Sequence, residues 1–152
     1  MAFAPAPPPK SLLGYHRQLA PSAAVRVSPL CLGAMSFGDA WKDFLGACDK
    51  KTTYEILDFF KDNGGNFIDT ASNYQNEESE KWIGDWMEER GNRDEIVLAT
   101  KFTTAYQTHE GHGKIIHSNF GGNNAKGIRH SVEASLKKLK TEFIDLLWLH
   151  WW

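Results

Sequence analysis

Short apolar runs alternate with longer amphipathic stretches along most of this chain. Three runs have the character of strands: residues 66–71 (NFIDTA), 95–101 (EIVLATK), which is almost continuously apolar, and 143–152 (FIDLLWLHWW). Strands of a parallel sheet that is covered on both faces have this pattern, because neither face of the strand meets water. We therefore predict three such strands, and an earlier buried strand in residues 29–38 (PLCLGAMSFG) that enters a glycine-containing loop.

The stretches between these runs have the period of an amphipathic helix. The predicted helices cover residues 52–63, 77–90 and about 128–140. Each has its apolar residues on one side: Ile56 and Phe60 in the first helix; Trp82, Ile83, Trp86 and Met87 in the second; Ile128, Val132, Leu136 and Leu139 in the third. Thr52 and Glu55 have the spacing of a capping box at the start of the first helix. The pair Gly64-Gly65 is expected to end that helix.

A hairpin at the start and a polar insert before the third helix complete the pattern. Residues 12–31 hold two β-prone pieces around a turn at residues 20–23, and residues 103–126 are polar and rich in glycine. The order hairpin, then β, α, β, α, β, α, β predicts a parallel α/β architecture. An open dinucleotide-binding sheet would carry GxGxxG after its first strand, and LCLGAMSFG lacks that spacing. The alternation alone fits either an open sheet or a barrel.

Composition and charge restrict the class of protein without identifying a function. The 152 residues are 24% charged and 41% hydrophobic with a net charge of -2, which fits a globular domain and gives no sign of a nucleic-acid or membrane surface. We expect residues 1–11 to be a disordered Ala/Pro-rich arm rather than a secretory signal, ahead of one domain at 12–152. No stretch has the ~20 apolar residues of a membrane helix. Cys31 and Cys48 favour a reduced, cytoplasmic setting, with a disulfide between them as the alternative.

Polar side chains stand where three of the predicted strands end. These are Asp69, Lys101 and His150, and Tyr74 follows Asp69 by five residues. Because the carboxyl ends of parallel strands share one rim, we expect the four side chains to meet there. Each also has a structural interpretation: a turn cap for the aspartate, a core cover for the tyrosine, a solvated strand end for the lysine and packing for the histidine. Their coincidence favours chemistry over four separate structural roles.

This set of groups is suited to protonating a carbonyl oxygen. A free tyrosine has a pKa of about 10, which is too high for efficient proton donation at neutral pH. A lysine ammonium within hydrogen-bonding reach favours the phenolate, and an aspartate paired with that lysine holds the ammonium in place. A nearby histidine can orient the carbonyl. The site would protonate the oxygen while hydride arrives at the carbon, with no need for a metal or a covalent nucleophile.

Histidines in the polar insert raise a second interpretation, a metal site. His109, His112 and His117 lie near one another in the sequence, together with Glu110. Their spacing fits no helical ligand pattern, and the stretch is rich in glycine, so a solvated loop is favoured over a metal centre. We expect no bound metal.

The strands and the tyrosine turn closely resemble the aldo/keto reductases. The segments GGNFIDTASNYQNEESEKWIG, EIVLATKF and IDLLWLHWW carry the resemblance, which runs from about Leu13 to Trp152. The branch most similar is the fungal aryl-alcohol dehydrogenases, with the norsolorinic-acid-reductase-like enzymes beside it. The resemblance implies a parallel (β/α)8 barrel of TIM type that binds NADPH or NADP+ at its mouth. It also implies the interconversion of small aromatic aldehydes or ketones with their alcohols.

The resemblance implies a role for each residue of the rim. The implied catalytic set is Tyr74 as general acid and base, Lys101 as the residue that lowers its pKa, Asp69 as the partner of Lys101, and His150 as the group that orients the carbonyl. The implied cofactor-binding residues are Gly33, Ala34 and Met35, which match a segment lining the nicotinamide end, together with Asp69. Weaker candidates for the substrate wall are Trp41, Phe102 and Trp151, for which packing roles are equally consistent with the sequence.

The family pattern extends beyond this chain. A (β/α)8 barrel typically takes ~250 residues, whereas this sequence reaches only the fourth strand, so we expect the hairpin and roughly the first four β/α units of a truncated barrel. The other half would carry most of the phosphate-binding loops, and we expect the isolated chain to bind NADPH weakly or not at all. Open strand edges favour self-association. The alternative function is a catalytically inactive truncated copy, or a half-barrel that aggregates or associates with another chain.

Overall fold

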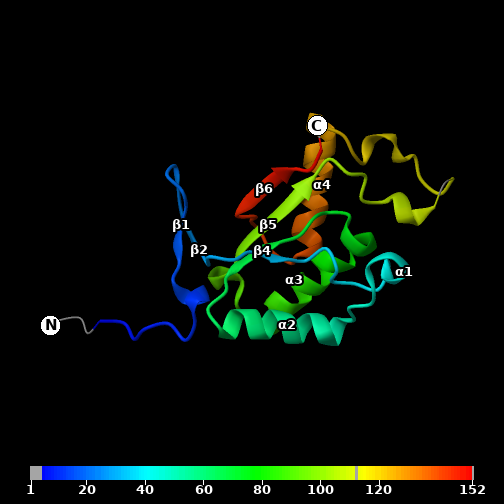
Figure 1. Ribbon diagram of the computed structural model, residues 1–152. Helices are drawn as coiled ribbons and strands as arrows, with labels where there is room; N and C mark the ends of the chain where they lie inside the picture. Colours follow the sequence, from blue (N-terminus) through cyan, green and yellow to red (C-terminus); the bar gives the residue numbers. More distant parts are fainter. Residues whose placement is uncertain (1–4, 112, 152) are drawn as a thin grey trace.

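Four parallel strands, placed side by side in chain order, form the main sheet. The structure is a computed structural model that describes residues 5–111 and 113–151. The strands are β3 (Leu32–Gly33), β4 (Phe67–Asp69), β5 (Val97–Phe102) and β6 (Leu146–Leu149), in the order β3-β4-β5-β6. A separate antiparallel hairpin is formed by β1 (Arg17–Ala20) and β2 (Ala23–Val27), as predicted (Figure 1). Parallel strands in chain order, joined by helices, are the arrangement of a (β/α)8 barrel.

Helices connect the parallel strands and cover one face of the sheet (Figure 1). They are α1 (Lys42–Leu45), α2 (Lys50–Asp62), α3 (Glu78–Arg90) and α4 (Ala125–Lys138). Short 3-10 turns lie at η1 (Leu12–Gly14), η2 (Tyr74–Glu77), η3 (Arg93–Glu95), η4 (Thr108–Glu110) and η5 (His117–Asn119). The predicted alternation of strands and helices is confirmed, and the last two of these turns lie inside the predicted insert.

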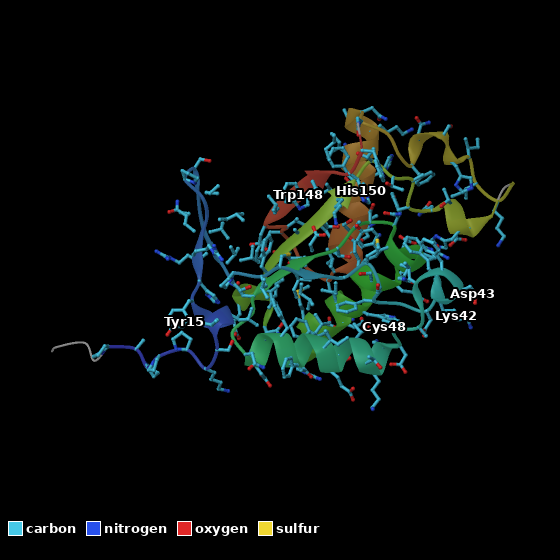
Figure 2. The ribbon with its side chains drawn as sticks, viewed as in Figure 1. Tyr15, Lys42, Asp43, Cys48, Trp148 and His150 are labelled. Carbon is cyan, nitrogen blue, oxygen red and sulfur yellow. The ribbon has the colours of Figure 1, made fainter. Side chains whose placement is uncertain are left out.

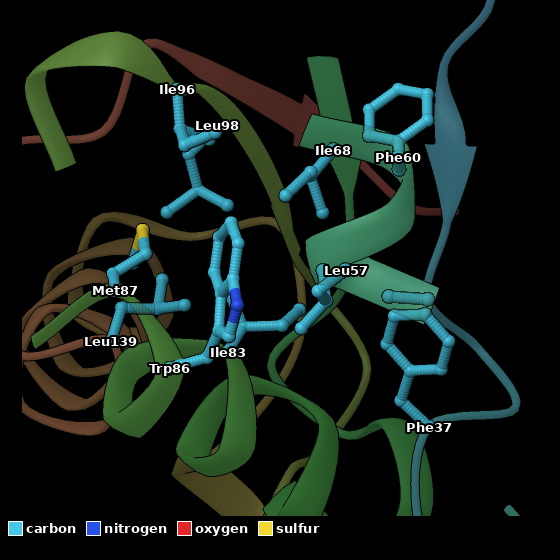
Figure 3. Close-up of a cluster of buried hydrophobic side chains, with 11 residues drawn as sticks. Phe37, Leu57, Phe60, Ile68, Ile83, Trp86, Met87, Ile96, Leu98 and Leu139 are labelled. Atoms are coloured by element: carbon cyan, nitrogen blue, oxygen red, sulfur yellow. The ribbon is translucent and has the colours of Figure 1, made fainter. Parts of the chain in front are cut away.

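The hydrophobic core lies between the sheet and the helices α2 and α3. Trp86 of α3 is fully buried, and Figure 3 shows its ring among Ile68 and Leu98 from the strands and Leu57 from α2. The indole nitrogen of Trp86 is not left unsatisfied, because it donates a hydrogen bond to Asp58 Oδ1 at 2.7 Å. A buried polar group without such a partner would cost stability. The core thus fixes the helices against the outer face of β4 and β5.

Asn66, the residue before β4, joins the hairpin to the parallel sheet. Its side-chain oxygen accepts a hydrogen bond from the Ser28 amide at 2.7 Å, and its side-chain nitrogen donates to the Arg26 carbonyl at 3.0 Å. Its own carbonyl accepts from the Val97 amide at 2.7 Å, at the start of β5. One asparagine therefore ties the hairpin to the starts of two parallel strands, at the end of the sheet opposite the predicted rim.

Two helices begin earlier than the apolar pattern predicted. The N-cap of α2 is Asp49, whose carboxylate accepts from the Thr52 amide at 2.8 Å, so the predicted capping box of Thr52 and Glu55 is wrong. The N-cap of α4 is Asn124, whose side chain accepts from the Gly127 amide at 2.9 Å. In both helices the first turn carries no large apolar residue of the buried face, so periodicity alone could not show it.

Small residues, rather than large apolar ones, form much of the buried face of α4. Gly127, Ser131 and Ser135 are buried, whereas Ile128 is 37% exposed, so the predicted placement of Ile128 in the core is wrong. Neighbouring backbone approaches α4 closely at both of its ends. A Cβ added to Gly127 would lie 2.8 Å from the carbonyl oxygen of Gly122, and α3 approaches the other end through Gly84. A Cβ added to Gly84 would lie 2.7 Å from the Cα of Leu139, and closer still to the carbonyl oxygen of Lys138.

Both edge strands of the sheet are less covered than the pattern predicted. The first, β3, is only two residues long, with Leu32 half-buried and Gly33 exposed, so the prediction of a buried strand there is wrong. At the other edge, the side chains of β6 are exposed as well, with Trp148 at 45% and Leu149 at 48%. An edge strand lacks a neighbour on one side, and continuous apolarity alone does not reveal this.

Both ends of the chain are exposed as far as they are described. Trp151 is exposed like Trp148, and Trp152 lies outside the described residues. Residues 5–10 are exposed and form no helix or strand, whereas residues 1–4 of the predicted arm are not among those described. Within the described ranges, every helix is too short or too polar to cross a membrane.

Replacement of Gly84 by alanine should destabilise the protein although alanine is the better helix former. In an exposed helix this change stabilises by about 1 kcal/mol. Here the added methyl would collide with backbone at the start of the loop after α4, so we expect a net loss of about 1–3 kcal/mol in the free energy of unfolding. Urea denaturation measures it. Gly33→Ala is the matched control, since a Cβ there would meet no atom within 4 Å, and an equal loss in both variants would contradict this account.

Candidate active site

Lys101 occupies the centre of the rim formed by the carboxyl ends of β4, β5 and β6. Its ammonium donates hydrogen bonds to Asp69 Oδ2 at 2.5 Å, to the Thr70 carbonyl at 2.7 Å and to the Tyr74 hydroxyl at 3.1 Å. An ammonium has three protons, and all three have partners. The predicted meeting of the acid, the phenol and the amine is confirmed, with the lysine as the shared donor.

Tyr74 is held between two rings on the loop beyond β4. It is 9% exposed, and its ring centroid lies 6.3 Å from that of Trp41 and 5.7 Å from that of His150, both in edge-on geometry. Edge-on aromatic pairs of this spacing are favourable. The three residues that follow, Gln75, Asn76 and Glu77, all have positive φ angles, of 51°, 51° and 77°. This tight turn aims the phenol back at Lys101.

His150 lies beside Tyr74 and is held by the polar insert. One nitrogen, Nδ1, is 3.2 Å from Thr104 Oγ1, and the ring stacks on Trp151 with centroids 5.6 Å apart. Burial, followed by the positive charge of Lys101, lowers the pKa of His150 below its usual 6.5. The imidazole is therefore neutral at neutral pH and can pair with a neutral carbonyl or hydroxyl group. All four predicted catalytic side chains come together at one rim.

A cavity of about 490 Å³ opens at Asp69, Lys101 and His150, on the face of the sheet opposite the helices, and Tyr74 reaches it only through its contact with Lys101. It is lined by Cys31, Gly33, Phe67, Asp69, Lys101, Trp148, Leu149 and His150. Figure 2 shows Trp148 and His150 next to one another at this part of the sheet. The volume is in the range of small-molecule sites. Mostly apolar walls with an ion pair and an imidazole at the rim suit a mostly apolar ligand that carries a polar group.

Four of the lining residues were not predicted. Strand periodicity could have found three of them, but not Leu149, which directly precedes His150. Cys31, Phe67 and Trp148 each lie two residues before a predicted site residue on the same strand or its extension. Side chains two apart on a strand point to the same face. Burial and then the charge of Asp69 raise the pKa of Cys31 to about 11, so this thiol is protonated at neutral pH.

The predicted cofactor segment is divided between three environments. Gly33 lines the cavity beside Asp69. Ala34 is fully buried, and its amide donates to the Asp69 carbonyl at 2.8 Å while its carbonyl accepts from Ser79 Oγ at 2.8 Å. Met35 is 45% exposed. Because both backbone polar groups of Ala34 are already bonded, this residue supports the strand end, and only its neighbours face solvent.

None of the three candidates for the substrate wall is among the residues that line the cavity, and the three differ in position. Trp41 packs edge-on against Tyr74, and Trp151 stacks on His150 while remaining 63% exposed. Phe102 is not brought to the cavity: it is 7% exposed and points to the helix side of β5. Its neighbour Lys101 takes the cavity side, and adjacent residues of a strand point to opposite faces. The structure thus leaves Phe102 with a packing role.

The two described histidines of the insert contact different groups. His109 Nε2 lies 3.4 Å from Glu77 and 3.6 Å from Glu110, and His117 Nε2 lies 3.3 Å from the Gly111 carbonyl. His112 falls outside the described residues. In the part of the chain that the structure covers, no three His, Cys, Asp or Glu side chains gather as metal ligands would.

Comparison with known proteins identifies the family of the chain. Residues 29–152 match the sequence profile of the Aldo/keto reductase family, so the chain belongs to this family. Norsolorinic acid reductase A of Aspergillus parasiticus is 58% identical over 152 residues, which are 100% of this chain and 39% of that protein. Aryl-alcohol dehydrogenase GME11368 of Pestalotiopsis microspora is 55% identical over 152 residues, which are 100% of this chain and 39% of that protein.

Solved structures agree with the fold. An aldo-keto reductase from Pseudomonas aeruginosa matches with a TM-score of 0.69 at 31% identity, over 91% of this chain and 48% of that chain. The predicted family and its TIM-type barrel are therefore confirmed, and the choice between an open sheet and a barrel is settled in favour of the barrel. The chain spans 39% of the length of norsolorinic acid reductase A and about half of this bacterial relative.

The lowered pKa of His150 should make the folded chain less stable in mild acid. The unfolded chain takes up this proton near pH 6.5, before the folded chain does. The contribution of His150 to the free energy of unfolding is therefore complete above pH 6.5 and is lost as the pH falls below it. Proton NMR should find the midpoint of His150 below 6.5, and Lys101→Met should raise that midpoint by removing a like charge. A midpoint at or above 6.5 in the wild type would refute this assignment.

Proposed function

We propose that this chain carries the proton-transfer site of an NADP(H)-dependent oxidoreductase that interconverts aryl aldehydes or ketones with their alcohols. The observation that carries the proposal is the pair of hydrogen bonds from Lys101, to the Tyr74 hydroxyl at 3.1 Å and to Asp69 at 2.5 Å. A phenol held by an ammonium, beside a mostly apolar cavity, is suited to giving a proton to a carbonyl oxygen. The names of the related proteins point to the same chemistry.

In this proposal the side chains of the rim divide the work of proton transfer. Tyr74 donates its hydroxyl proton to the carbonyl oxygen during reduction, and takes a proton from the alcohol during oxidation. The Lys101 ammonium stabilises the negative charge left on the phenol oxygen, and Asp69 keeps that ammonium in place. His150, neutral and held near Thr104, orients the carbonyl. The surrounding tryptophans favour an aromatic substrate.

The cavity fits the nicotinamide end of the cofactor better than its phosphates. Gly33, Phe67 and Trp148 offer flat apolar surface next to the rim, and when bound the cofactor supplies the hydride to the carbonyl carbon. Of the described residues that line the cavity, Lys101 alone is a cation, and Asp69 already neutralises it. We therefore propose weak binding of NADPH by this chain. A dissociation constant in the micromolar range, from a fluorescence titration, would contradict weak binding.

Replacement of Tyr74 by phenylalanine should remove the activity and leave the fold intact. We expect NADPH oxidation with veratraldehyde to fall by at least about 100-fold, the usual contribution of a general acid, while the circular dichroism spectrum stays unchanged. The assay needs the cofactor at millimolar concentration, because binding is weak. Tyr54→Phe is the matched control, since Tyr54 bonds Glu89 on the helical surface away from the rim. Full activity in Tyr74→Phe would exclude this mechanism.

The exposed edge strand favours a second candidate, in which the chain associates with a further copy of itself through β6. Leu147, Trp148 and Leu149 are 39%, 45% and 48% exposed on a strand with a free edge. Apolar edges of this kind pair readily with other chains. Light scattering after gel filtration should show a mass that grows with concentration, and Leu147→Lys should reduce it. A constant monomer mass would rule out this candidate. Self-association is compatible with the cytoplasmic setting and the oxidoreductase activity that we propose. Neither the self-association nor the activity requires a membrane or a nucleic acid.

A further inference from the structure

A cluster of charged side chains is buried on the helix side of the sheet, away from the cavity. Glu80 of α3 has no exposed side-chain surface, and its Oε2 lies 2.7 Å from Nζ of Lys138, which is 7% exposed. A second carboxylate, Glu77, is 11% exposed and places Oε1 3.1 Å from the same nitrogen. Charges lose much favourable hydration when they are buried, and such a cluster adds little net stability over apolar packing. Its position therefore calls for another explanation.

Lys138 holds both ends of the turn that carries Tyr74. Its Nζ donates a hydrogen bond to the Ser72 carbonyl at 2.7 Å and forms the ion pair with Glu77. Ser72 lies two residues before Tyr74, and Glu77 lies three residues after it. A single ammonium from α4 thus bridges the two ends of the segment whose middle presents the phenol to Lys101.

The turn needs external support because its backbone is strained. Gln75, Asn76 and Glu77 are consecutive residues with positive φ, and L-residues other than glycine rarely adopt this conformation even singly. Such backbone persists only where the surrounding structure holds it. Gln75 secures the middle of the turn, since its side chain accepts from the Trp41 amide at 2.7 Å and donates to the Met35 carbonyl at 3.0 Å. Lys138 secures its ends.

Glu80 connects the same cluster to the strand that carries Lys101. Thr100 Oγ1 donates a hydrogen bond to Glu80 Oε1 at 2.6 Å. Thr100 directly precedes Lys101, and its side chain points to the opposite face of β5. The pair Lys138–Glu80 therefore links the turn that bears the phenol with the strand that bears the ammonium.

We propose that Lys138 and Glu80 are positioning residues that keep the Tyr74 hydroxyl within hydrogen-bonding distance of Lys101. They touch neither the cavity nor a reacting atom, and they act through the backbone of the turn and through Thr100. The polar insert also packs on this cluster, since Lys138 Nζ lies 5.0 Å from the ring centroid of Tyr106 and His109 lies 3.4 Å from Glu77. The functional value of this positioning rests on the proposed reductase activity, but the positioning itself does not.

NMR of the chain labelled with 13Cζ-tyrosine tests the proposal without an activity assay. The Tyr74 signal is assigned by its loss in Tyr74→Phe. In the double variant Lys138→Met/Glu80→Gln, which removes the buried pair together, this signal should move toward its position in Lys101→Met. The Tyr54 signal should not move. Lys137→Met, which removes an exposed lysine next along α4, is the matched control and should leave the Tyr74 signal in place.

An unmoved Tyr74 signal in the folded double variant would overturn the proposal. If the double variant does not fold, Thr100→Val takes its place, because this change removes one hydrogen bond of Glu80 and leaves the ion pair. It should move the Tyr74 signal in the same direction, and an unmoved signal would again overturn the proposal. The reductase assay separates the two claims. If kcat of the double variant falls by about 10- to 100-fold while KM stays unchanged, both the positioning role and the proposed function are supported. If the Tyr74 signal moves but the wild-type chain has no reductase activity, the positioning role is supported and the proposed function is refuted.

Discussion

The site depends on the three hydrogen bonds that the Lys101 ammonium donates. Their acceptors are Asp69 at the end of β4, the next residue Thr70, and Tyr74 on the following turn, so one side chain of β5 holds the end of β4 and the turn together. With Lys101 13% and Asp69 28% exposed, the charges are sheltered enough for their mutual orientation to persist, yet they border a cavity that a ligand can enter. A neutral side chain at position 101 would leave the carboxylate and the phenol without a common partner.

The register of the sheet explains why a lysine serves at this position. Asp69 is paired with Ala99 on β5, and Lys101 lies two residues beyond Ala99. At the rise per residue of a strand, the backbone of Lys101 is therefore about 6.6 Å further along than that of Asp69. A long, flexible side chain is needed to return over that distance to the carboxylate, and the phenol approaches from the loop above. Behind the sheet, Lys138 repeats the arrangement with a buried carboxylate and a loop carbonyl. Two lysines on opposite faces thus fix one loop.

The sequence allowed the parallel alternation and the four rim residues to be predicted, because both follow from local periodicity and from where strands end. Phe102 shows where that reasoning fell short, since alternation along β5 sends it to the helices while Lys101 takes the cavity side. The starts of α2 after Asp49 and of α4 after Asn124 were not predicted, because the first turns of these helices carry no large apolar residue of the buried face. The buried cluster around Lys138 could not be predicted, because its partners lie on different elements, and a lysine in a predicted last helical turn is ordinarily a surface residue.

The most direct measurement of the central claim is a double-mutant cycle between Tyr74 and Lys101 on the single-turnover rate of carbonyl reduction, with Tyr74→Phe, Lys101→Met and both together. If the phenol works only through the ammonium that it touches, the double variant should lose no more rate than Tyr74→Phe alone, because residues that act as a unit are strongly non-additive. Losses that multiply would show that the two residues act independently, and would contradict a site built on their hydrogen bond.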